Sequence, residues 1–224
     1  MKRSFTFSGL WLACIVGSLS VIPYVQYLGI LPIPVPFETL FFVVAQTSVL
    51  YGLALSLSYW ILPKTDLEPF SYKKQSFYLS IIVGISCGLI IFLLDKTIFK
   101  SSMLSAVHPP FWAGALASIY GGINEEVLLR LFLFTLIYFL LSFTKSNRSL
   151  LLWTTNILVA LAFGIGHLPA AFKLASPSTF ETVRVLVLNG IPGIAFVWLY
   201  FSHGFYAAAL AHFITDLVIH VILI

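Results

Sequence analysis

The chain has 224 residues, of which 60% are hydrophobic and only 9% are charged, with a formal net charge of +4. Its mean hydropathy of +1.02 excludes an ordinary soluble globular domain and indicates an integral membrane protein. Because a span needs about 20 apolar residues, the length allows about seven or eight transmembrane helices and no separate soluble domain. The apolar runs are continuous rather than alternating, which favours helices over a β-barrel. The predicted fold class is therefore all-α, a polytopic transmembrane helical bundle.

Apolar segments divide the chain into seven predicted spans. Their bounds are roughly 5–31, 38–62, 77–98, 111–142, 150–172, 183–201 and 205–224. We expect residues 1–224 to form one integral membrane domain, with N-terminal spans over about 5–98 and a motif-bearing core over about 111–224. The first segment follows two basic residues as a signal peptide would, but its apolar run continues to about Tyr27, which is long enough to span.

Basic residues between the spans predict the orientation of the chain. Seven lie on the side of the N-terminus, namely Lys2, Arg3, Lys64, Lys73, Lys74, Lys145 and Arg148. Four lie on the other side, namely Lys96, Lys100, Lys173 and Arg184. By the positive-inside rule, this distribution places the N-terminus in the cytoplasm. The basic charge thus reports orientation and not nucleic-acid binding, for which we find no module. The compact, loop-poor chain favours a prokaryotic plasma membrane.

Several polar groups outside the candidate site receive structural interpretations. Cys14 and Cys87 fall in apolar spans, where free cysteines behave as small buried hydrophobic residues. His108 and His203 lie beside proline or glycine and are predicted to be loop residues. Residues 63–75 form the most polar segment, which we expect either along the cytoplasmic interface or as a solvated loop.

Two adjacent carboxylates, Glu125 and Glu126, lie within the span 111–142, and Arg130 follows one turn later. An ionised side chain at the centre of a membrane helix costs about 2.5–3.5 kcal/mol on insertion scales, so such residues generally face a protein-lined cavity. Glu126 and Arg130 are four residues apart, which favours an ion pair on one helix face. Glu125 projects about 100° away and is left free, so we predict it to be a general base. The alternative is that all three groups only lock helices together.

The next span contains a histidine beside small residues. Phe163 and His167 are four residues apart and share one helix face. We expect Gly164 and Gly166 to let a neighbouring helix approach closely. A lone histidine in such a run is more often a hydrogen-bonded core residue than a catalyst. A functional role for His167 is therefore predicted only in combination with the other polar groups.

The last span adds further ionisable residues at helical spacing. His212 and Asp216 are four residues apart on one face, and His220 continues the same stripe. Together with Glu125 and His167, they make three stripes of groups suited to proton transfer or metal binding on helices otherwise poor in polar residues. We therefore predict that these stripes converge on a single wet pocket within the membrane.

The predicted spans place the site residues at different depths. Glu125 and His212 lie near mid-membrane, whereas His167 falls about 10 Å towards the outer end at about 1.5 Å rise per residue. Tilted or broken helices would close this gap, and Gly121 and Gly122 offer a place for bending.

Three motifs, in this order, resemble those of the CPBP family, which comprises the type II CAAX prenyl endopeptidases and bacterial bacteriocin-processing and self-immunity proteins. Residues 125–130 resemble its EExxxR motif, residues 163–167 its FxxxH motif and residues 212–216 its Hxxx(D/N) motif. The three together are fairly specific, whereas any one alone is weak. The resemblance covers about residues 115–220, and the first three spans carry no such motif.

The resemblance implies an intramembrane endopeptidase on an all-helical bundle, in which a water molecule attacks the peptide carbonyl. Carried over by motif, Glu125 is the general base and His167 helps to hold and activate the water. His212 and Asp216 position or stabilise the oxyanion. The remaining motif residues support the site, namely Glu126, Arg130 and Phe163.

The residue types allow two kinds of mechanism. An ionised Asp216 can only accept hydrogen bonds, so it must be protonated, orient His212 or help to hold a cation. Two histidines and two carboxylates suit a divalent metal such as zinc, and the candidate ligands are Glu125, His167, His212 and Asp216. The chain has no HExxH helix, and we favour a metal-free, glutamate-driven mechanism without a cofactor.

An intramembrane endopeptidase leads three function classes. The second is a catalytically idle membrane protein that acts as an immunity or regulatory partner. The third is a proton-coupled transporter, against which the small size and the lack of an internal repeat count. The expected partners are membrane lipid and a peptide or protein substrate, which a CAAX-type activity would require to be prenylated. Neither prenylation nor the oligomeric state follows from the sequence.

Overall fold

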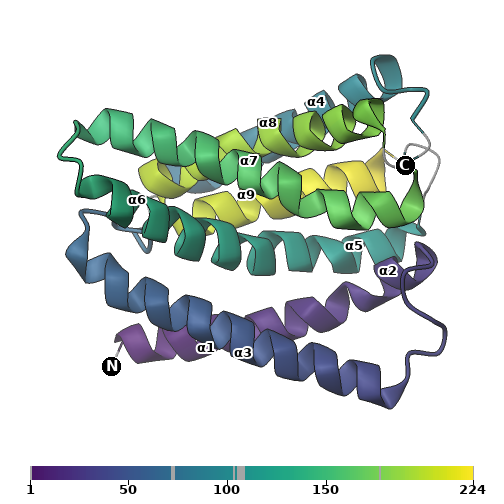
Figure 1. Ribbon diagram of the computed structural model, residues 1–224, viewed down its shortest axis with the longest axis horizontal. Helices are drawn as coiled ribbons and strands as arrows, with labels where there is room; N and C mark the ends of the chain where they lie inside the picture. The colour runs from purple at the N-terminus through teal and green to yellow at the C-terminus, as the bar shows by residue number, and fades with distance from the viewer. Residues whose placement is uncertain (1, 72–73, 103, 105–108, 177, 224) are drawn as a thin grey trace.

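The computed structural model describes residues 2–71, 74–102, 104, 109–176 and 178–223, with only the backbone described for residues 2–5. Over these residues the chain is a bundle of helices that run back and forth along one long direction (Figure 1). The N-terminus and the C-terminus lie at opposite ends of the bundle (Figure 1). His108 and Lys73, to which the sequence assigned a loop and an orientation role, lie outside the described residues.

The first three crossings are mostly regular helices. α1 (Lys2–Ser20) and α2 (Ile22–Tyr27) together make the first, and α3 (Phe37–Ile61) returns towards the N-terminal end. A short 3-10 turn, η1 (Leu62–Lys64), then leads to α4 (Lys74–Thr97), which crosses the bundle again. Each crossing is long enough to traverse about 30 Å of hydrocarbon.

The fourth crossing is helical throughout but changes its winding twice. It begins as α5 (Phe111–Tyr120), continues as the π-helical segments η3 (Gly121–Glu125) and η4 (Val127–Phe134), and ends as α6 (Thr135–Ser142). A π-helical turn adds a residue to the ring closed by each hydrogen bond, so it rotates the following side chains relative to an α-helix. The two adjacent glutamates lie at this irregular stretch, where such turns often mark functional sites.

The remaining crossings form the C-terminal half. α7 (Arg148–Leu174) packs along α8 (Thr179–His203), and α9 (Phe205–Leu217) continues into the π-helical segment η5 (Val218–Ile222). His203 is the last residue of α8, so the prediction that it is a loop residue is wrong. The adjacent glycine, and not the histidine, breaks the helix.

The predicted all-α transmembrane bundle is confirmed. Six helical stretches are long and apolar enough to cross a membrane, namely Thr6–Tyr27, Phe37–Lys64, Lys74–Thr97, Arg148–Leu174, Thr179–His203 and Phe205–Ile222. The one predicted span outside these six, 111–142, corresponds to the segmented run from α5 to α6. The prediction of about seven spans therefore agrees with the helices observed among the described residues.

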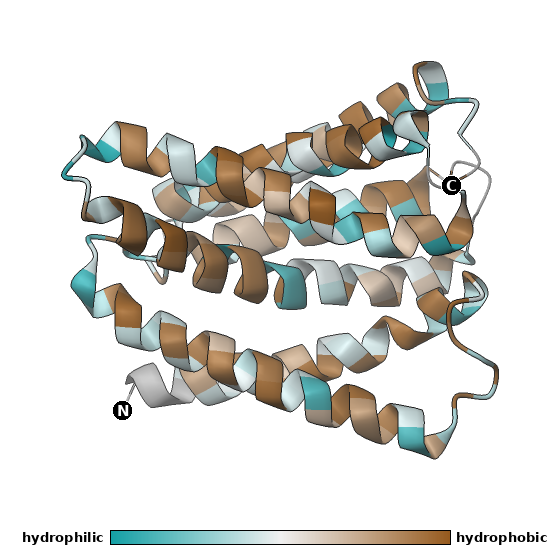
Figure 2. Ribbon diagram, in the orientation of Figure 1, coloured by the Kyte–Doolittle hydropathy of each residue, from teal (hydrophilic) through white to brown (hydrophobic). Residues whose placement is uncertain are grey.

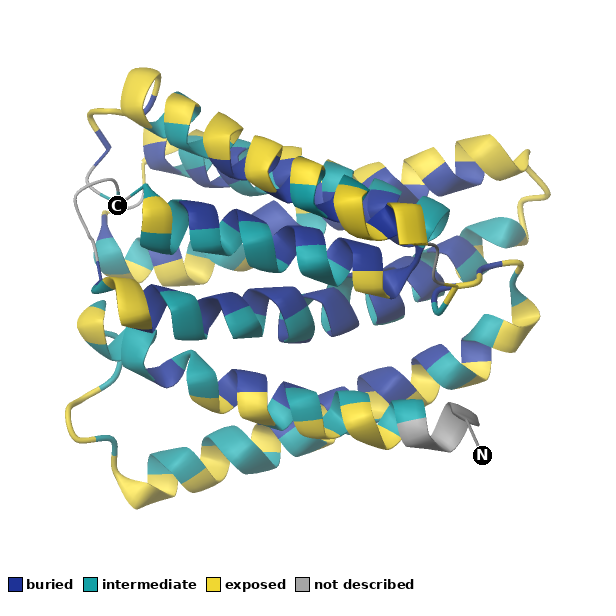
Figure 3. Cartoon of the chain, turned by 180° about the vertical axis from the view of Figure 1, so that it is seen from behind, coloured by how far each residue is buried: buried dark blue, intermediate teal, exposed yellow. Residues whose placement is uncertain are grey.

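The outer surface of the bundle is apolar. Hydrophobic residues extend along the helices between polar ends (Figure 2), and exposed residues follow the outward faces of the helices (Figure 3). Large apolar side chains such as Phe37, Phe42 and Ile82 are more than half exposed. A soluble monomer rarely exposes so much contiguous apolar surface, whereas lipid tails accommodate it.

α9 packs very closely against its neighbours. A Cβ added at Gly84 of α4 would lie 2.6 Å from the carbonyl oxygen of Ala211, and one added at Gly88 would lie 2.6 Å from Val218, the first residue of η5, which continues α9. A Cβ at Gly122 would meet Phe213 at 2.9 Å. Small residues allow such close backbone approach between membrane helices. The histidine-bearing helix is thereby held against both α4 and the glutamate-bearing segment.

A loop at the N-terminal end ties the first half of the chain to the second. Gly204, between α8 and α9, has a φ of 91°, and a Cβ there would lie 2.5 Å from the carbonyl oxygen of Ser71. The backbone N–H of Phe205 donates to the carbonyl oxygen of Pro69 at 2.6 Å. Only glycine adopts this backbone conformation readily, so the turn and the loop fit together at this residue.

The same loop carries an exposed ion pair. Asp66 accepts hydrogen bonds from the hydroxyl of Tyr138, at 2.7 Å, and from Nε of Arg148. Partial burial opposes ionisation of Asp66, but these hydrogen bonds and the arginine charge outweigh it and lower the pKa of its carboxyl group. The pair links the loop to the start of α7.

Candidate active site

The carboxylate of Glu125 lies between two imidazoles. Its Oε1 is 3.8 Å from Nε2 of His167 on α7, and its Oε2 is 3.6 Å from Nε2 of His212 on α9. Both distances are too long for a direct hydrogen bond but short enough for one water molecule to contact both partners. Three elements that are far apart in the sequence therefore meet at this carboxylate.

Glu126 holds the other side of the His212 ring. Its Oε1 accepts a hydrogen bond from Nδ1 of His212 at 2.6 Å and lies 3.0 Å from Nη1 of Arg130. The side chains of Glu126 and Arg130 are both 0% exposed. Burial of a charged group is costly, and a group of opposite charge beside it offsets part of that cost. Arg130 thus holds Glu126, which in turn orients His212.

The hydrogen bond at Nδ1 of each histidine determines whether its Nε2 can accept a hydrogen bond or donate one on the side of Glu125. Nδ1 of His167 lies 2.8 Å from the carbonyl oxygen of Phe163, and because a carbonyl can only accept, this nitrogen carries a proton. Nδ1 of His212 likewise donates to the carboxylate of Glu126. In both rings Nε2 is left to face Glu125, where it accepts when the ring is neutral and donates when it is protonated.

Asp216 lies one helical turn after His212, with its Oδ1 3.7 Å from Nε2 of that histidine. Its carboxylate lies against the backbone of Gly121. A Cβ added at this glycine would be 2.1 Å from Oδ2 of Asp216 and 3.2 Å from Nε2 of His212. The absence of a side chain at residue 121 therefore makes room for both the carboxylate and the imidazole.

Two phenylalanine rings enclose the buried part of the site. The ring of Phe196 on α8 stacks on His212 with centroids 4.6 Å apart and 22° between the planes. The guanidinium carbon of Arg130 lies 4.8 Å from the ring centroid of Phe163 and 5.4 Å from that of Phe196. Phe163 also meets the rings of His167 and His212 edge to face. Cation–π and ring contacts thus restrain the arginine and both histidines.

These groups border one cavity of about 580 Å³. Its walls include Glu125, His167, His212 and Asp216 together with the apolar side chains of α7 and α8. The side chains of Glu125 and His167 are 21% and 36% exposed, whereas that of His212 is 4% exposed. The cavity is large enough for a segment of peptide and presents a few polar groups on a largely apolar wall, as substrate sites commonly do.

The structure brings together all four residues predicted to be catalytic. Glu125, His167, His212 and Asp216 face the same cavity, and the predicted supporting residues Glu126, Arg130 and Phe163 contact them. The expected difference in depth between His167 and Glu125 is not observed, because Nε2 of His167 lies 3.8 Å from Oε1 of Glu125. The catalytic roles themselves stay predictions.

Of the two glycines expected to allow close helix packing on α7, only one does so. A Cβ at Gly164 would lie 3.3 Å from atoms of Leu186 on α8, in tight contact. A Cβ at Gly166 would meet nothing within 4 Å, and this residue borders the cavity instead. The expectation for Gly166 is wrong because residue 166 lies on the cavity side of the helix.

Two residues in or beside the site were not predicted from the sequence. Phe196 lies in an apolar span without a motif, so nothing in the sequence distinguishes it from other core aromatics. Asn124 is fully buried, and its Nδ2 donates to the carbonyl oxygen of Cys14 at 2.8 Å and to Oγ of Ser18 at 2.9 Å. A polar residue inside a predicted span was a usable signal for Asn124. It joins α1 to the segment that carries Glu125.

A structural or catalytic metal ion needs at least three protein donor atoms that converge on one point. Within the described part of the chain, no group of three or more histidine, cysteine, aspartate or glutamate side chains converges closely enough to hold one. Nδ1 of His167 and Nδ1 of His212 are both hydrogen-bonded, as the far ring nitrogens of metal-binding histidines usually are. The distances between the donor atoms are nevertheless too long for a metal site among the described residues.

Comparison with known proteins gives one family match. The family model described as Type II CAAX prenyl endopeptidase Rce1-like matches residues 107–218. The matched region begins just before α5 and ends at the start of η5, so it contains every residue of the cluster around Glu125. No curated protein and no solved structure matches the chain.

Proposed function

The chain belongs to the family of type II CAAX prenyl endopeptidases, and from this premise we propose that it is an intramembrane endopeptidase whose attacking water is activated by Glu125. The observation that carries the proposal is the position of this carboxylate, 3.8 Å from Nε2 of His167 and 3.6 Å from Nε2 of His212 at the wall of a 580 Å³ cavity. A general base must lie within reach of the water that it deprotonates, directly or through a hydrogen bond.

The attacking water donates one hydrogen bond to Glu125 and one to His167. Because Nδ1–H of His167 is committed to the carbonyl of Phe163, the neutral ring offers a lone pair at Nε2. A water held by these two acceptors directs an oxygen lone pair away from them, towards the peptide carbonyl. Glu125 takes one proton as the oxygen forms its bond to the carbonyl carbon. General base catalysis of this kind contributes about 10²–10⁴-fold to the rate.

His212 stabilises the oxyanion that forms in this step. Its Nδ1–H is committed to Glu126, so the ring donates from Nε2 in its doubly protonated form. The fixed carboxylate of Glu126 and the stacked ring of Phe196 hold the imidazole in place before the substrate arrives. Preorganised donors of this kind are worth about 2.7–4 kcal/mol in barrier height. Asp216 orients this ring from the cavity side and balances its charge.

Collapse of the tetrahedral intermediate completes the reaction. The bond from carbon to nitrogen breaks, and the leaving nitrogen takes the proton that Glu125 received from water. The products are a carboxylic acid and an amine, and Glu125 returns to its starting form. Every proton in this scheme is moved by side chains of the chain itself, so the proposal includes no cofactor. Titration of the purified protein with a chelator tests this part, because a metal-free mechanism predicts unchanged turnover.

The substrate is proposed to be a peptide or protein segment at the membrane, and a CAAX-type substrate would carry a prenylated C-terminal cysteine. We also propose that the N-terminus lies in the cytoplasm of a prokaryotic plasma membrane. The excess of basic residues at the N-terminal end supports this orientation.

Comparison of membrane peptides between cells with the wild-type protein and cells with Glu125→Gln tests the proposed function. The substitution removes the base while keeping size and hydrogen-bonding capacity. We expect cleavage products that appear with the wild-type protein and vanish with the variant at equal protein levels. If the phenotype of the cells persists in the variant without any cleavage product, the protein acts as a binding partner. Loss of a proton flux instead of a peptide product would identify a transporter.

A further inference from the structure

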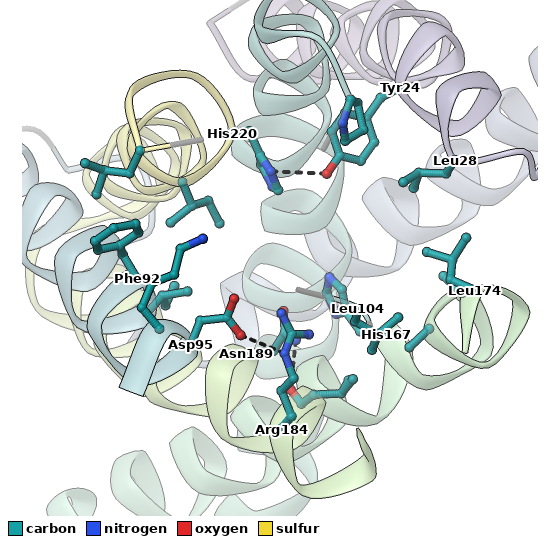
Figure 4. A pocket seen from close by; sticks show the side chains of 18 residues that line it. Tyr24, Leu28, Phe92, Asp95, Leu104, His167, Leu174, Arg184, Asn189 and His220 are labelled. Atoms are coloured by element: carbon teal, nitrogen blue, oxygen red, sulfur yellow. Dashed lines mark hydrogen bonds and ion pairs between the residues drawn. The ribbon is translucent and has the colours of Figure 1, made fainter. Parts of the chain in front are cut away.

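A second cavity, which we call the side pocket, adjoins the cavity around Glu125. It has a volume of about 290 Å³, and residues such as His167, Arg184 and His220 line both cavities. Figure 4 shows the side pocket with His167 at one wall and the linked pairs Arg184–Asp95 and His220–Tyr24 at others. Because the two cavities share these walls, a peptide held at His167 can extend into the side pocket.

An arginine held by an aspartate lies where the two cavities meet. Arg184, in the second turn of α8, donates a hydrogen bond from Nε to Oδ1 of Asp95, in the last turn of α4, at 2.7 Å. Both side chains are 16% exposed. This hydrogen bond does not use the terminal nitrogens Nη1 and Nη2, whose planar arrangement matches the two oxygens of a carboxylate. Asp95 therefore fixes the guanidinium and leaves its outer edge for a second carboxylate.

The two cavities differ in charge. Among the wall residues that the structure describes, the side pocket has one carboxylate, Asp95, and two cations, Arg184 and the exposed Lys96, which give it a formal charge of +1 with the histidines neutral. The walls of the larger cavity carry the carboxyl groups of Glu125 and Asp216. Like charges repel and opposite charges attract most strongly where little water screens them. A carboxylate on a bound peptide is therefore disfavoured beside Glu125 and favoured in the side pocket.

The other walls of the side pocket are mostly apolar. They include the side chains of Leu28, Ile91, Phe92, Leu104 and Leu174. Ligand sites commonly combine such walls with a few polar groups that fix the orientation of the ligand. The side pocket therefore suits a short apolar stretch of peptide that carries one carboxylate.

From these observations we infer that the side pocket is a carboxylate-binding subsite, in which Arg184 binds a carboxylate of the peptide substrate and Lys96 adds attraction. The inference rests on the proposed function for the existence of a peptide substrate and adds the group by which the peptide is recognised. That carboxylate belongs either to the C-terminus of the peptide or to an acidic side chain, which have the same chemistry. In both cases the spacing between Arg184 and Glu125 determines which peptide bond reaches the base.

Hydrolysis of one peptide in three forms tests the subsite. The peptide is one whose cleavage in cells depends on Glu125, and it is made unchanged, with a C-terminal amide, or with its acidic side chains replaced by amides. With the wild-type protein in proteoliposomes, we expect one of the two replacements to raise KM by about 10–100-fold, the usual worth of a hydrogen bond to a charged group. The replacement that does so identifies the source of the carboxylate. Equal KM values for all three forms would overturn the inference.

Arg184→Gln removes the proposed partner of the carboxylate. This variant should raise KM for the unchanged peptide by the same factor, keep kcat close to the wild-type value and no longer distinguish the three forms. Arg148→Gln is the matched control, because it removes the cation of an exposed ion pair at the other end of the bundle, and it should distinguish the forms as the wild-type protein does. If Arg184→Gln impairs cleavage of all three forms equally, Arg184 only joins α8 to α4 and the inference fails.

Binding without turnover separates this inference from the proposed function. The probes are two pairs of an acid and its amide: N-acetyl-trileucine with a free C-terminus or a C-terminal amide, and the amide of N-acetyl-Leu-Glu-Leu or of its glutamine analogue. In calorimetric titrations of the purified protein, we expect the acid of at least one pair to bind about 10–100-fold more tightly than its amide, and Arg184→Gln to abolish this difference. This result in a protein that cleaves no peptide would support the subsite and contradict the protease function. Glu125-dependent cleavage with equal binding within both pairs would overturn the subsite and leave the protease function intact.

Discussion

Two clusters of paired charges show how differently this chain treats ionised groups. In the cluster of Glu126, Arg130 and His212, within the bundle, the first two side chains are 0% exposed. The pair of Asp66 and Arg148, at the N-terminal end, is 51% and 57% exposed. Burial of charge is costly, whereas an exposed pair costs and contributes little. The large energetic cost of burying Glu126 and Arg130 falls where these charges orient a histidine of the candidate active site.

The largest effect is expected when one partner of the buried cluster is removed. Arg130→Met leaves the carboxylate of Glu126 buried without its arginine partner, which should lower the free energy of unfolding by about 3–5 kcal/mol. Thermal unfolding of the purified protein in detergent measures this change. The matched control is the double variant Glu126→Gln with Arg130→Met, which removes both charges and should recover part of the stability. An unfolding temperature equal to that of the wild-type protein in Arg130→Met would show that the buried pair has no structural role.

A smaller loss is expected where the site depends on close packing and not on charge. Gly121→Ala places a methyl group 2.1 Å from Oδ2 of Asp216, so the carboxylate and the neighbouring imidazole must shift. Overpacking of this kind costs about 1–3 kcal/mol. We expect loss of Glu125-dependent cleavage with moderate destabilisation.

Gly190→Ala is the matched control for Gly121→Ala, because a Cβ at this helical glycine meets nothing within 4 Å. The control should keep its activity and be as stable as the wild-type protein or more so, since alanine favours a helix over glycine. Equal activity in the two variants would contradict the described contact between Gly121 and Asp216.

The smallest effect is expected at the exposed cluster. Because the pKa of Asp66 is lowered in the folded protein, its contribution to stability is present above the ordinary aspartate pKa and is lost as the pH falls through the lowered value. Asp66→Asn should therefore lower stability at neutral pH by at most about 1 kcal/mol and have no effect at strongly acidic pH. The unfolding temperatures of the wild-type protein and of Asp66→Asn, measured from neutral to strongly acidic pH, test this expectation. A loss as large as that of Arg130→Met would remove the contrast between the clusters.

Features that depend on the spacing of residues within one helix could be predicted from the sequence. The pairing of Glu126 with Arg130 and the freedom of Glu125 follow from helical spacing within one segment, and the 3.0 Å ion pair confirms the pairing. The approach of His167 and His212 to Glu125 was expected from residue types and from the motif resemblance. Spans rich in apolar residues were equally visible, because a membrane helix needs a continuous hydrophobic run.

Contacts between helices were less accessible to sequence reasoning. The position of Phe196 against His212 depends on the rotation of α8 about its axis, which an all-round apolar helix does not reveal. The opposite behaviour of Gly164 and Gly166 depends on which side of α7 faces its neighbour. The π-helical winding at Gly121–Glu125 likewise follows from tertiary packing, although the adjacent glycines indicated a place for bending.

Hydrolysis by the purified protein measures the central claim most directly. With a peptide found in the cellular comparison as substrate, the rates of the wild-type protein, Glu125→Gln and the control Glu38→Gln are compared in proteoliposomes. Glu38 is an exposed carboxylate on α3, so its substitution removes a charge without touching the site. We predict that Glu125→Gln lowers the rate by about 10²–10⁴-fold at an unchanged unfolding temperature, while the control cleaves normally. Cleavage by Glu125→Gln at the wild-type rate would contradict the assignment of Glu125 as the base.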